Sequence, residues 1–566
     1  MKNIIIIPIL LLFLGFFLFQ SDKTERIEKA DEICLAQFPI TFSYQNMIDD
    51  EKTVKDIFLD YEVGIDLSNL YFTELPDDIF KNTPCIKKCN FASNSLLNIP
   101  TAIQYLPQLI HLDLNFNTIK HISRHSFVKN KALQYLNLDN NKIRDISFST
   151  FEQNKELQYI NLNNNQLQTL DLNTFKTINR VNLTSNSIDT ILPIIDQDAY
   201  QINHLNLNRN KLTSIDLNAL KSIKSLKLGR NNIKKIQPIR QDNHPINTTS
   251  LDLAYNKLSR FPVEIFLLDK LESLDLEYNN IGSDTNFIKI PFEKLQMVNF
   301  LNLSKNGFLR FPEELGKMPN LEWLFLDKNQ ITGSIIFKDF DQLSRLKIRN
   351  QSVKSFIMEK SQVTHIDLSG NQIHTFKVTE KNTTLNELTL RDNQLSKLSP
   401  SINQLVGLNR LDLSHNNLKN LPDLSDLTNL KELELTGNDL TEIPNKDQLY
   451  PKYNNNPFTL YLSFNSIKTL DFERVNKNIT ELVLSNNNIS SIENLTELPN
   501  LKKLYLNGNS NLKEFSTDVL YYLTNLEELN LENTSLDPIT VYLITQIAKK
   551  ENIQLTIDEG KLEMNY

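Results

Sequence analysis

One motif recurs along almost the whole chain and constrains its fold more than any other feature. The motif has the form L-x-x-L-x-L-x-x-N-x-L, and clear copies lie at 109–119, 133–143 and 408–418. Its asparagine falls at Asn94, Asn117, Asn141, Asn165, Asn186, Asn210, Asn231, Asn256, Asn279, Asn306, Asn329, Asn371, Asn393, Asn416, Asn438, Asn465, Asn487 and Asn509. Weaker copies place Leu70, Gln351 and Thr534 there, which predicts about 21 repeats with a period of about 23 residues.

The residue types of the motif predict a solenoid. Alternating leucines point to one side of a short strand, so each strand has one apolar face. A single repeat cannot bury that face, and consecutive repeats must therefore stack and share a core. The asparagine turns the chain inward, where its amide can satisfy backbone groups of the loop and of the next repeat. We expect an α/β solenoid, a horseshoe or arc whose concave side is a parallel β-sheet.

These repeats resemble those of leucine-rich-repeat proteins over residues 63–557. Several repeats place a phenylalanine ten residues after the asparagine position of the motif, namely Phe80, Phe127, Phe151, Phe175 and Phe266. This style resembles the animal extracellular class, which includes Toll-like receptor ectodomains and secreted leucine-rich-repeat immune factors of insects. The cysteine-rich caps of that class are missing. The resemblance implies a binding protein of innate immunity or cell recognition.

The N-terminus has the pattern of a secretory signal. Lys2 precedes an apolar run at 4–19, and polar residues follow at 20–23. A charged start, a short apolar core and a polar exit are typical of a signal peptide. The residues before the exit form no small-x-small cleavage site, so a retained signal anchor is the alternative. We expect a secreted, extracellular protein, attached to a membrane only if this segment is uncleaved.

Both ends of a solenoid require caps, because an open end exposes the leucine core. Apolar alternation over 33–61 predicts an N-terminal cap, while 539–548 predicts an amphipathic helix and 553–557 a closing strand. No flexible linker interrupts the repeats. The expected organisation is a signal peptide or anchor at 1–21, a cap at 22–62, the solenoid at 63–538, and a C-terminal cap and polar tail at 539–566.

The chain has three cysteines, Cys34, Cys85 and Cys89. In an oxidising compartment Cys34 could bridge Cys85 or Cys89. Cys89 takes an inward strand position where a small apolar residue is expected, which favours a disulfide between Cys34 and Cys85. The odd cysteine leaves pairing between chains open.

The sequence contains none of the motifs that carry common catalytic chemistry. It has no glycine-rich phosphate loop, no His-Glu-x-x-His and no Cys-x-x-Cys. His121 and His125 are four residues apart but lie in the outer part of a repeat without a third ligand. We expect no enzymatic activity, no cofactor and no metal. The net charge of −8 also gives no reason to expect nucleic acid as a partner.

The function that remains is binding by the concave sheet. The non-leucine residues of each strand point onto this sheet, as do the two residues before each asparagine. The richest stretch of this face comprises the aromatic residues Tyr255, Tyr278, Phe300, Trp323 and Phe325 and the cations Arg345, Lys347 and Arg349. Exposed aromatics beside arginine are typical of binding hot spots. The alternative is that cross-strand aromatic pairs only stabilise the sheet. A weaker second cluster comprises Tyr461, Phe464 and Tyr505.

Two further patterns concern the same face. Tyr135 and Tyr159 are in register and should stack, beside a structural ladder formed by Asn137, Asn161, Asn182 and Asn206. Sequons for N-glycosylation occur at Asn182, Asn247, Asn302, Asn350, Asn382, Asn478, Asn488, Asn494 and Asn533. A glycan at Asn302 would crowd the aromatic stretch.

The sequence thus predicts a secreted, non-enzymatic binding protein whose concave face recognises a protein, or a glycan or microbial ligand at a surface. One alternative is a membrane-anchored adhesive or structural protein. Another is an intracellular interaction scaffold or regulator. The identity of the ligand and dimerisation stay open.

Overall fold

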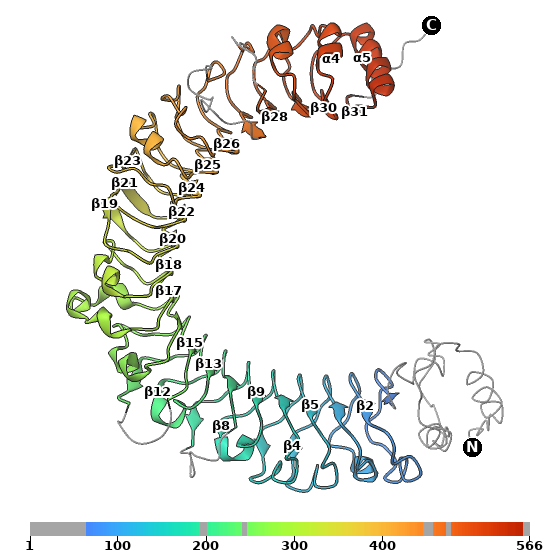
Figure 1. Ribbon diagram of the computed structural model, residues 1–566. Helices are drawn as coiled ribbons and strands as arrows, with labels where there is room; N and C mark the ends of the chain where they lie inside the picture. The colour runs from blue at the N-terminus through green and yellow to red at the C-terminus, as the bar shows by residue number, and fades with distance from the viewer. Residues whose placement is uncertain are drawn as a thin grey trace, which may run out of the picture. The chain divides into compact units, whose positions relative to one another are not determined.

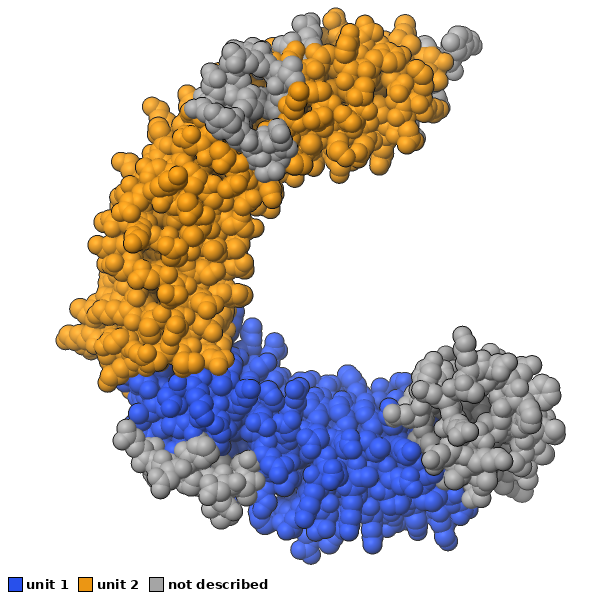
Figure 2. Space-filling model, viewed as in Figure 1, with its two compact units in different colours: residues 1–258, 262–271 blue, residues 259–261, 272–566 orange. Residues whose placement is uncertain are grey.

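The computed structural model describes residues 64–192, 201–239, 246–444, 457–470, 472 and 477–558. The chain divides into a first unit, Met1–Leu258 with Pro262–Leu271, and a second unit, Ser259–Phe261 with Glu272–Tyr566 (Figure 2). The repeat motif runs through both units. The predicted signal segment, the predicted N-terminal cap, Cys34 and the last eight residues of the predicted tail lie outside the described residues.

The repeats build parallel β-sheet in both units, with 22 such strands in the described part of the chain. In the first unit they are β1 (Gly64–Asp66), β2 (Lys88–Asn90), β3 (His111–Asp113), β5 (Tyr135–Asn137), β7 (Tyr159–Asn161), β9 (Arg180–Asn182), β11 (His204–Asn206), β13 (Ser225–Lys227) and β15 (Ser250–Asp252). In the second unit they are β16 (Ser273–Asp275), β17 (Phe300–Asn302), β18 (Trp323–Phe325), β20 (Arg345–Lys347), β22 (His365–Asp367), β24 (Glu387–Thr389), β25 (Arg410–Asp412), β26 (Glu432–Glu434), β27 (Phe458–Tyr461), β28 (Ile479–Val483), β29 (Lys503–Tyr505), β30 (Glu528–Asn530) and β31 (Gln554–Thr556). In each unit these strands line one side, and the outer segments form the other (Figure 1).

Neighbouring strands align equivalent positions of consecutive repeats. In the second unit Leu301 of β17 lies opposite Leu324 of β18, which lies opposite Leu346 of β20. All three leucines are fully buried, as the motif requires, while the residues on either side of them face away from the core. The predicted solenoid with a parallel sheet is therefore confirmed.

The motif asparagines form a buried ladder beneath the ends of the strands. At Asn117 the side-chain Nδ2 donates to the carbonyls of Phe91 (2.9 Å) and Leu114 (3.1 Å), and Oδ1 accepts from the amide of Leu96 (2.9 Å). These partners belong to its own turn and to the preceding repeat, rather than to the next repeat as we expected. Asn416 repeats the pattern in the second unit. Each asparagine thus ties two repeats together through buried polar groups.

The outer side of the repeats varies more than the sheet. Its short strands are β4 (His121–Ile122), β6 (Asp145–Ile146), β8 (Thr169–Leu170), β10 (Thr190–Ile191), β12 (Ser214–Asp216), β14 (Lys235–Gln237), β19 (Thr332–Phe337), β21 (Ser352–Met358) and β23 (Thr375–Val378). Its 3-10 turns are η2 (Thr101–Tyr105), η3 (Leu172–Phe175), η5 (Leu217–Ala219), η6 (Val263–Leu267), η7 (Ile281–Ser283), η8 (Phe287–Lys289), η9 (Phe292–Lys294), η10 (Glu313–Lys317), η11 (Pro400–Gln404) and η12 (Glu493–Glu497). Predicted phenylalanines pack beneath it: the ring of Phe151 lies 5.8 Å from that of Phe127 and 6.0 Å from that of Phe175.

Two α-helices lie near the C-terminus, α4 (Asp518–Tyr522) and α5 (Pro538–Glu551). Asp537 begins α5 by accepting hydrogen bonds from the amides of Ile539 and Thr540, and Asn552 ends it in the left-handed conformation. Strand β31 follows and pairs with β30, so this end has the helix and closing strand that the sequence predicted. Within the described ranges no helix has the length and apolar character needed to cross a bilayer.

The two cysteines that the structure describes have different states. Cys85 is disulfide-bonded, whereas Cys89 is a free thiol on the buried face of β2. Burial raises the pKa of the Cys89 thiol, which keeps it protonated and unreactive. The inward position predicted for Cys89 is confirmed, and Cys34 stays the predicted partner of Cys85.

Candidate ligand-binding surface

In the three-residue sheet strands the first and third residues form two parallel rows on the face opposite the core, and Thr459 and Tyr461 of β27 and Glu481 and Val483 of β28 continue these rows. Across β17, β18 and β20, one row contains Phe300, Trp323 and Arg345, and the other contains Asn302, Phe325 and Lys347. Five of the predicted site residues therefore lie on three consecutive strands of the second unit. Their positions follow directly from the register of the leucines.

Phe300, Trp323 and Phe325 pack against one another, and we call them the aromatic cluster. The centre of the Phe300 ring lies 6.3 Å from that of Trp323 and 5.4 Å from that of Phe325, the latter pair edge to face. Trp323 and Phe325 are 6.4 Å apart. Trp323 keeps 42% of its surface exposed, while both phenylalanines are half-buried. The two phenylalanines thus stabilise the sheet and support an exposed indole.

Two cations border the aromatic cluster. The guanidinium carbon of Arg345 lies 5.3 Å from the centre of the Trp323 ring, and Lys347 Nζ lies 4.9 Å from that of Phe325. Both distances are suited to cation–π attraction, which orients the side chains without neutralising them. Neither cation forms an ion pair with a described carboxylate. Their positive charge is therefore available to an acidic group of a ligand.

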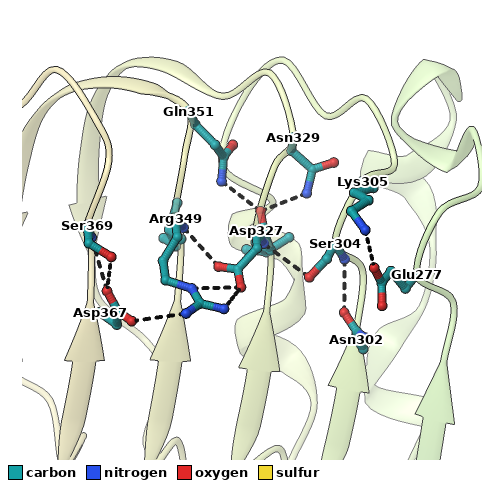
Figure 3. A network of polar contacts seen from close by, with 12 residues as sticks. Glu277, Asn302, Ser304, Lys305, Asp327, Asn329, Arg349, Gln351, Asp367 and Ser369 are labelled. Atoms are coloured by element: carbon teal, nitrogen blue, oxygen red, sulfur yellow. Dashed lines mark hydrogen bonds and ion pairs between the residues drawn. The ribbon is translucent and has the colours of Figure 1, made fainter. Parts of the chain in front are cut away.

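Arg349, the third predicted cation, is held in an ion-pair network instead (Figure 3). Its Nη2 lies 2.6 Å from Asp327 Oδ2, and its Nη1 lies 3.7 Å from Asp367 Oδ2. The hydrogen bonds to Asp327 raise the pKa of Arg349. Because two carboxylates compensate its charge, Arg349 stabilises the turns that follow β18 and β20 rather than offering a free cation.

The two predicted tyrosines lie after their strands, in the position that directly precedes the motif asparagine. Tyr278 and Tyr255 both adopt left-handed backbone there, with φ of 56° and 55°. Tyr278 is 54% exposed, and Lys305 Nζ lies 5.7 Å from its ring. Tyr255 belongs to the first unit, where the guanidinium of Arg230 covers its ring at 4.2 Å. Tyr278 therefore flanks the strands of the aromatic cluster, while Tyr255 is described only within its own unit.

The second predicted cluster lies among carboxylates that the sequence reading missed. Tyr461 and Tyr505 lie on one row of the sheet face, and Glu481 and Glu528 lie on the other. Burial, a hydrogen bond with Glu528 and the charges of both carboxylates raise the pKa of Tyr505 to about 12. The third member, Phe464, is 60% exposed in a left-handed turn. The carboxylates could have been found in the sequence, because they occupy the same motif position as Arg345.

In the first unit the predicted stacking of Tyr135 and Tyr159 is present, with ring centres 4.9 Å apart. His111 extends this stack on the neighbouring strand at 4.2 Å from Tyr135, a contact that a search for aromatic residues alone overlooked. The rings stack on each other and leave mainly their edges to solvent. The polar ladder beside them is internally bonded, since Asn182 Nδ2 donates to Asn161 Oδ1 at 3.0 Å.

The histidine pair of the first unit makes separate contacts. His121 Nδ1 pairs with Asp145 Oδ2 at 2.8 Å, and His125 Nε2 accepts a hydrogen bond from Arg124 Nε at 3.0 Å. All of these side chains are exposed or near the surface of outer segments. The ranges that the structure describes contain no group of three potential metal-ligating side chains.

Comparison with protein families agrees with the repeat architecture. The chain matches the family described as "Leucine rich repeat" at residues 91–143, 131–180 and 383–440, and "Leucine Rich repeats (2 copies)" at residues 477–522. With the repeated strands and the asparagine ladder, these matches show that the chain is a leucine-rich-repeat protein.

Individual relatives resemble parts of the chain. Keratocan of Mus musculus is 31% identical over 166 residues, which cover 28% of this chain and 46% of keratocan. The volume-regulated anion channel subunit LRRC8A of Rattus norvegicus is 35% identical over 86 residues, 15% of this chain and 10% of that protein. The chain thus spans less than half the length of these relatives.

Among solved structures, YopM from Yersinia enterocolitica is similar over 88% of this chain and 91% of YopM, with a TM-score of 0.49 and 19% identity. A chain of the Drosophila Toll–Spatzle complex is similar over 86% of this chain and 76% of its own length, with a TM-score of 0.44 and 19% identity.

Proposed function

We propose that this chain is a secreted, non-enzymatic recognition protein whose second unit binds a protein partner on its sheet face, in innate immunity or cell recognition. The exposed indole of Trp323 carries the proposal. A large aromatic side chain at the centre of a protein-binding patch supplies most of the binding energy when a partner buries it. Arg345 and Lys347 would recruit an acidic group of the partner beside it.

The competing explanation is that the aromatic side chains serve only the sheet. Cross-strand aromatic pairs contribute roughly 0.2–1 kcal/mol each, and the half-buried Phe300 and Phe325 fit that role. Trp323 fits it less well, because 42% of its surface stays exposed and its ring has Arg345 beside it rather than a further apolar neighbour. A sheet-stabilising residue would gain more from burial than this position allows.

The sequon at Asn302 does not count against this surface. Asn302 is 8% exposed, and its Oδ1 accepts a hydrogen bond from the Ser304 amide at 3.1 Å. A glycan on the buried side chain would have to displace the turn that follows β17. We expect Asn302 to carry no glycan in the folded protein, which keeps the aromatic cluster accessible.

The proposal is tested with the full chain as bait. A partner captured from extracellular fluid or from cell surfaces is purified, and its affinity is measured for the wild type, Trp323→Ala and the control Tyr542→Ala. Tyr542 is 50% exposed on α5 in the same unit, so it matches Trp323 in exposure but not in surroundings. We expect only Trp323→Ala to weaken binding, by about 2 kcal/mol or more. Unchanged binding by a folded Trp323→Ala protein would assign the aromatic cluster to sheet packing.

The membrane-anchored and intracellular alternatives differ from secretion in the fate of the N-terminus. Sequencing the first residues of the protein from secreted and membrane fractions distinguishes them. A secreted form that begins near residue 22 supports the proposal, a membrane form that retains residues 1–21 supports the anchor, and a cytosolic form with Met1 supports the scaffold.

A further inference from the structure

The sheet face of the first unit has a concentration of basic side chains around β9, β11 and β13, next to Tyr159 of β7, which lies opposite Arg180. Its members are Arg180 on β9, His204 on β11, Lys224 and Lys227 at β13, and Arg209 and Arg230 in the left-handed turns after β11 and β13. We call these six residues the basic patch. Arg180 lies opposite His204, and Lys227 lies opposite Asn206 of β11. Because parallel strands are about 4.8 Å apart, the charges gather within roughly 15 Å across the sheet.

The charges of the basic patch are largely uncompensated. Its five arginine and lysine side chains are exposed, and none forms an ion pair with a carboxylate in the part of the chain that the structure describes. Asp252 is the nearby acid on β15, where it accepts hydrogen bonds from Asn208 and from the Ala254 amide. Burial raises the pKa of Asp252, while its hydrogen bonds and the charges of Lys227 and Arg230 lower it, so one carboxylate faces five cations.

The pKa of His204, which lies within the patch, is consistent with the same concentration of positive charge. Burial lowers its pKa, and the charges of Arg180, Lys224 and Lys227 lower it further. A neutral imidazole next to three cations is the state expected where protonation would add a fourth like charge. Geometry and electrostatics thus agree that this face attracts an anion.

The chemistry around the charges narrows the kind of anion. Protein-binding hot spots are typically built on a desolvated aromatic anchor, and sites for single-stranded nucleic acid typically add exposed aromatic rings on which bases stack. The neighbouring aromatic rings are already engaged: Tyr159, opposite Arg180, stacks on Tyr135 at 4.9 Å, and Arg230 covers the ring of Tyr255 at 4.2 Å. Beside the cations lies the amide of Asn206, whose Oδ1 accepts from the Asn208 amide and whose Nδ2 can donate to hydroxyl and sulfate oxygens.

We propose that the basic patch binds a sulfated polysaccharide. Sulfate groups are spaced along such a chain and match cations that are spread over several strands, while arginine donors give them directed hydrogen bonds. Sugar hydroxyls would meet the Asn206 amide beside the cations. This site is separate from the protein-binding surface proposed for the second unit, and neither proposal depends on the other.

The test uses the full chain and a size-defined heparin oligosaccharide as the probe. The double variant Lys224→Glu/Lys227→Glu removes two members of the basic patch. Its control, Lys131→Glu/Lys155→Glu, makes the same change of charge at exposed lysines in other turns of the first unit. We expect the patch variant to bind the probe at least about ten-fold more weakly and with a smaller salt dependence, and the control to bind within about two-fold of the wild type, at about 0.15 M salt. Thermal unfolding checks that both variants fold, and Arg209→Gln offers a milder change if the double variant does not.

Other outcomes would overturn the proposal. Equal losses in the patch variant and the control would mean that net charge alone attracts the probe. Tighter binding of polyglutamate than of heparin would indicate an acidic protein segment, and tighter binding of single-stranded RNA would indicate nucleic acid. A wild type that fails to bind heparin at all would also reject it. Trp323→Ala should leave heparin binding unchanged, so failure of this proposal and failure of the protein-binding proposal are distinguishable.

Discussion

The sheet faces of the two units differ in chemistry although they share one backbone pattern. In the second unit, consecutive strands present an exposed indole packed against two phenylalanines, with Arg345 beside the indole and Lys347 beside Phe325. In the first unit, consecutive strands present cations and amides, while Tyr159 beside Arg180 is stacked on Tyr135 and the ring of Tyr255 is covered by Arg230. Aromatic rings and exposed cations therefore meet in both units, but the cations of the second unit accompany an exposed indole. The comparison shows that the repeat determines where a side chain lies but leaves its chemistry open.

The reason is a strict division between neighbouring positions of each strand. Leu324 is fully buried, while Trp323 directly before it is 42% exposed. A change at the leucine opens a cavity in the shared core, whereas a change at the tryptophan alters only the surface. Face positions can thus diverge between the units without loss of the fold.

The largest effect is expected where the two units are alike, in the asparagine ladder. Asn256→Leu in the first unit and Asn416→Leu in the second each remove donors to two repeats and an acceptor for a buried amide. We expect each to lower the free energy of unfolding by about 3 kcal/mol, because buried backbone groups lose partners worth roughly 1–3 kcal/mol each. Urea unfolding measures this, with the exposed neighbours Lys257→Ala and Asn417→Ala as controls. A loss of stability in only one of the two asparagine variants would show that the ladders of the two units are not equivalent.

The next effect concerns the difference between the faces. Trp323→Ala should weaken binding of a protein partner by about 2 kcal/mol, and Lys224→Glu/Lys227→Glu should leave that affinity unchanged within about 0.5 kcal/mol. Titration calorimetry with the captured partner measures both. Equal losses would mean that one ligand covers both surfaces, and the contrast between the two faces would then have to be abandoned.

A smaller effect separates the cations that follow the aromatic cluster. Arg349→Met should lower the free energy of unfolding by about 1 kcal/mol, because it leaves Asp327 without its partner while the pair remains partly exposed and screened. Lys347→Met should change stability little and should weaken partner binding instead. Chemical denaturation and binding measured on the same two proteins test this. If Arg349→Met affected binding alone, its ion pairs would not be structural.

Much of the fold and part of the candidate site could be predicted from the sequence, because the motif fixes how each repeat aligns with the next. The predicted asparagine positions follow the strands, and the leucine alignment placed Phe300 opposite Trp323 and Tyr135 opposite Tyr159. Phe127, one of the predicted phenylalanines, is also buried. Its ring stacks on the phenylalanine of the next repeat, which the motif places at the same position. Periodicity determines these features, so no knowledge of distant contacts was required.

Other features depend on pairs between repeats that the pattern does not select. Arg349 and Asp327 occupy the same motif position in consecutive repeats, and only their contact shows that the arginine is neutralised. The motif position of Tyr255 predicts an exposed ring, yet Arg230 of the preceding repeat covers that ring. The basic patch was missed because its members come from four motif positions, and no single position is basic throughout.

The smallest expected effect compares the cationic edge of the aromatic cluster with the acidic face around Tyr505. Burial and the carboxylates of Glu481 and Glu528 raise the pKa of Tyr505 to about 12, above the ordinary value of about 10 for tyrosine. A pKa raised in the folded state means that the folded protein holds this proton more tightly than the unfolded chain. Its stabilising contribution is therefore complete below about pH 10 and is lost as the pH rises toward 12.

Between these pH values, the Tyr505→Phe protein should lose stability slightly less steeply than the wild type. Its phenolate absorbance should lack one late ionisation step. Tyr522→Phe, at a position that is 65% exposed, should retain that step. If Tyr505→Phe and Tyr522→Phe gave the same titration curve, the carboxylates would not act on Tyr505, and the acidic character assigned to this part of the second unit's sheet would be wrong.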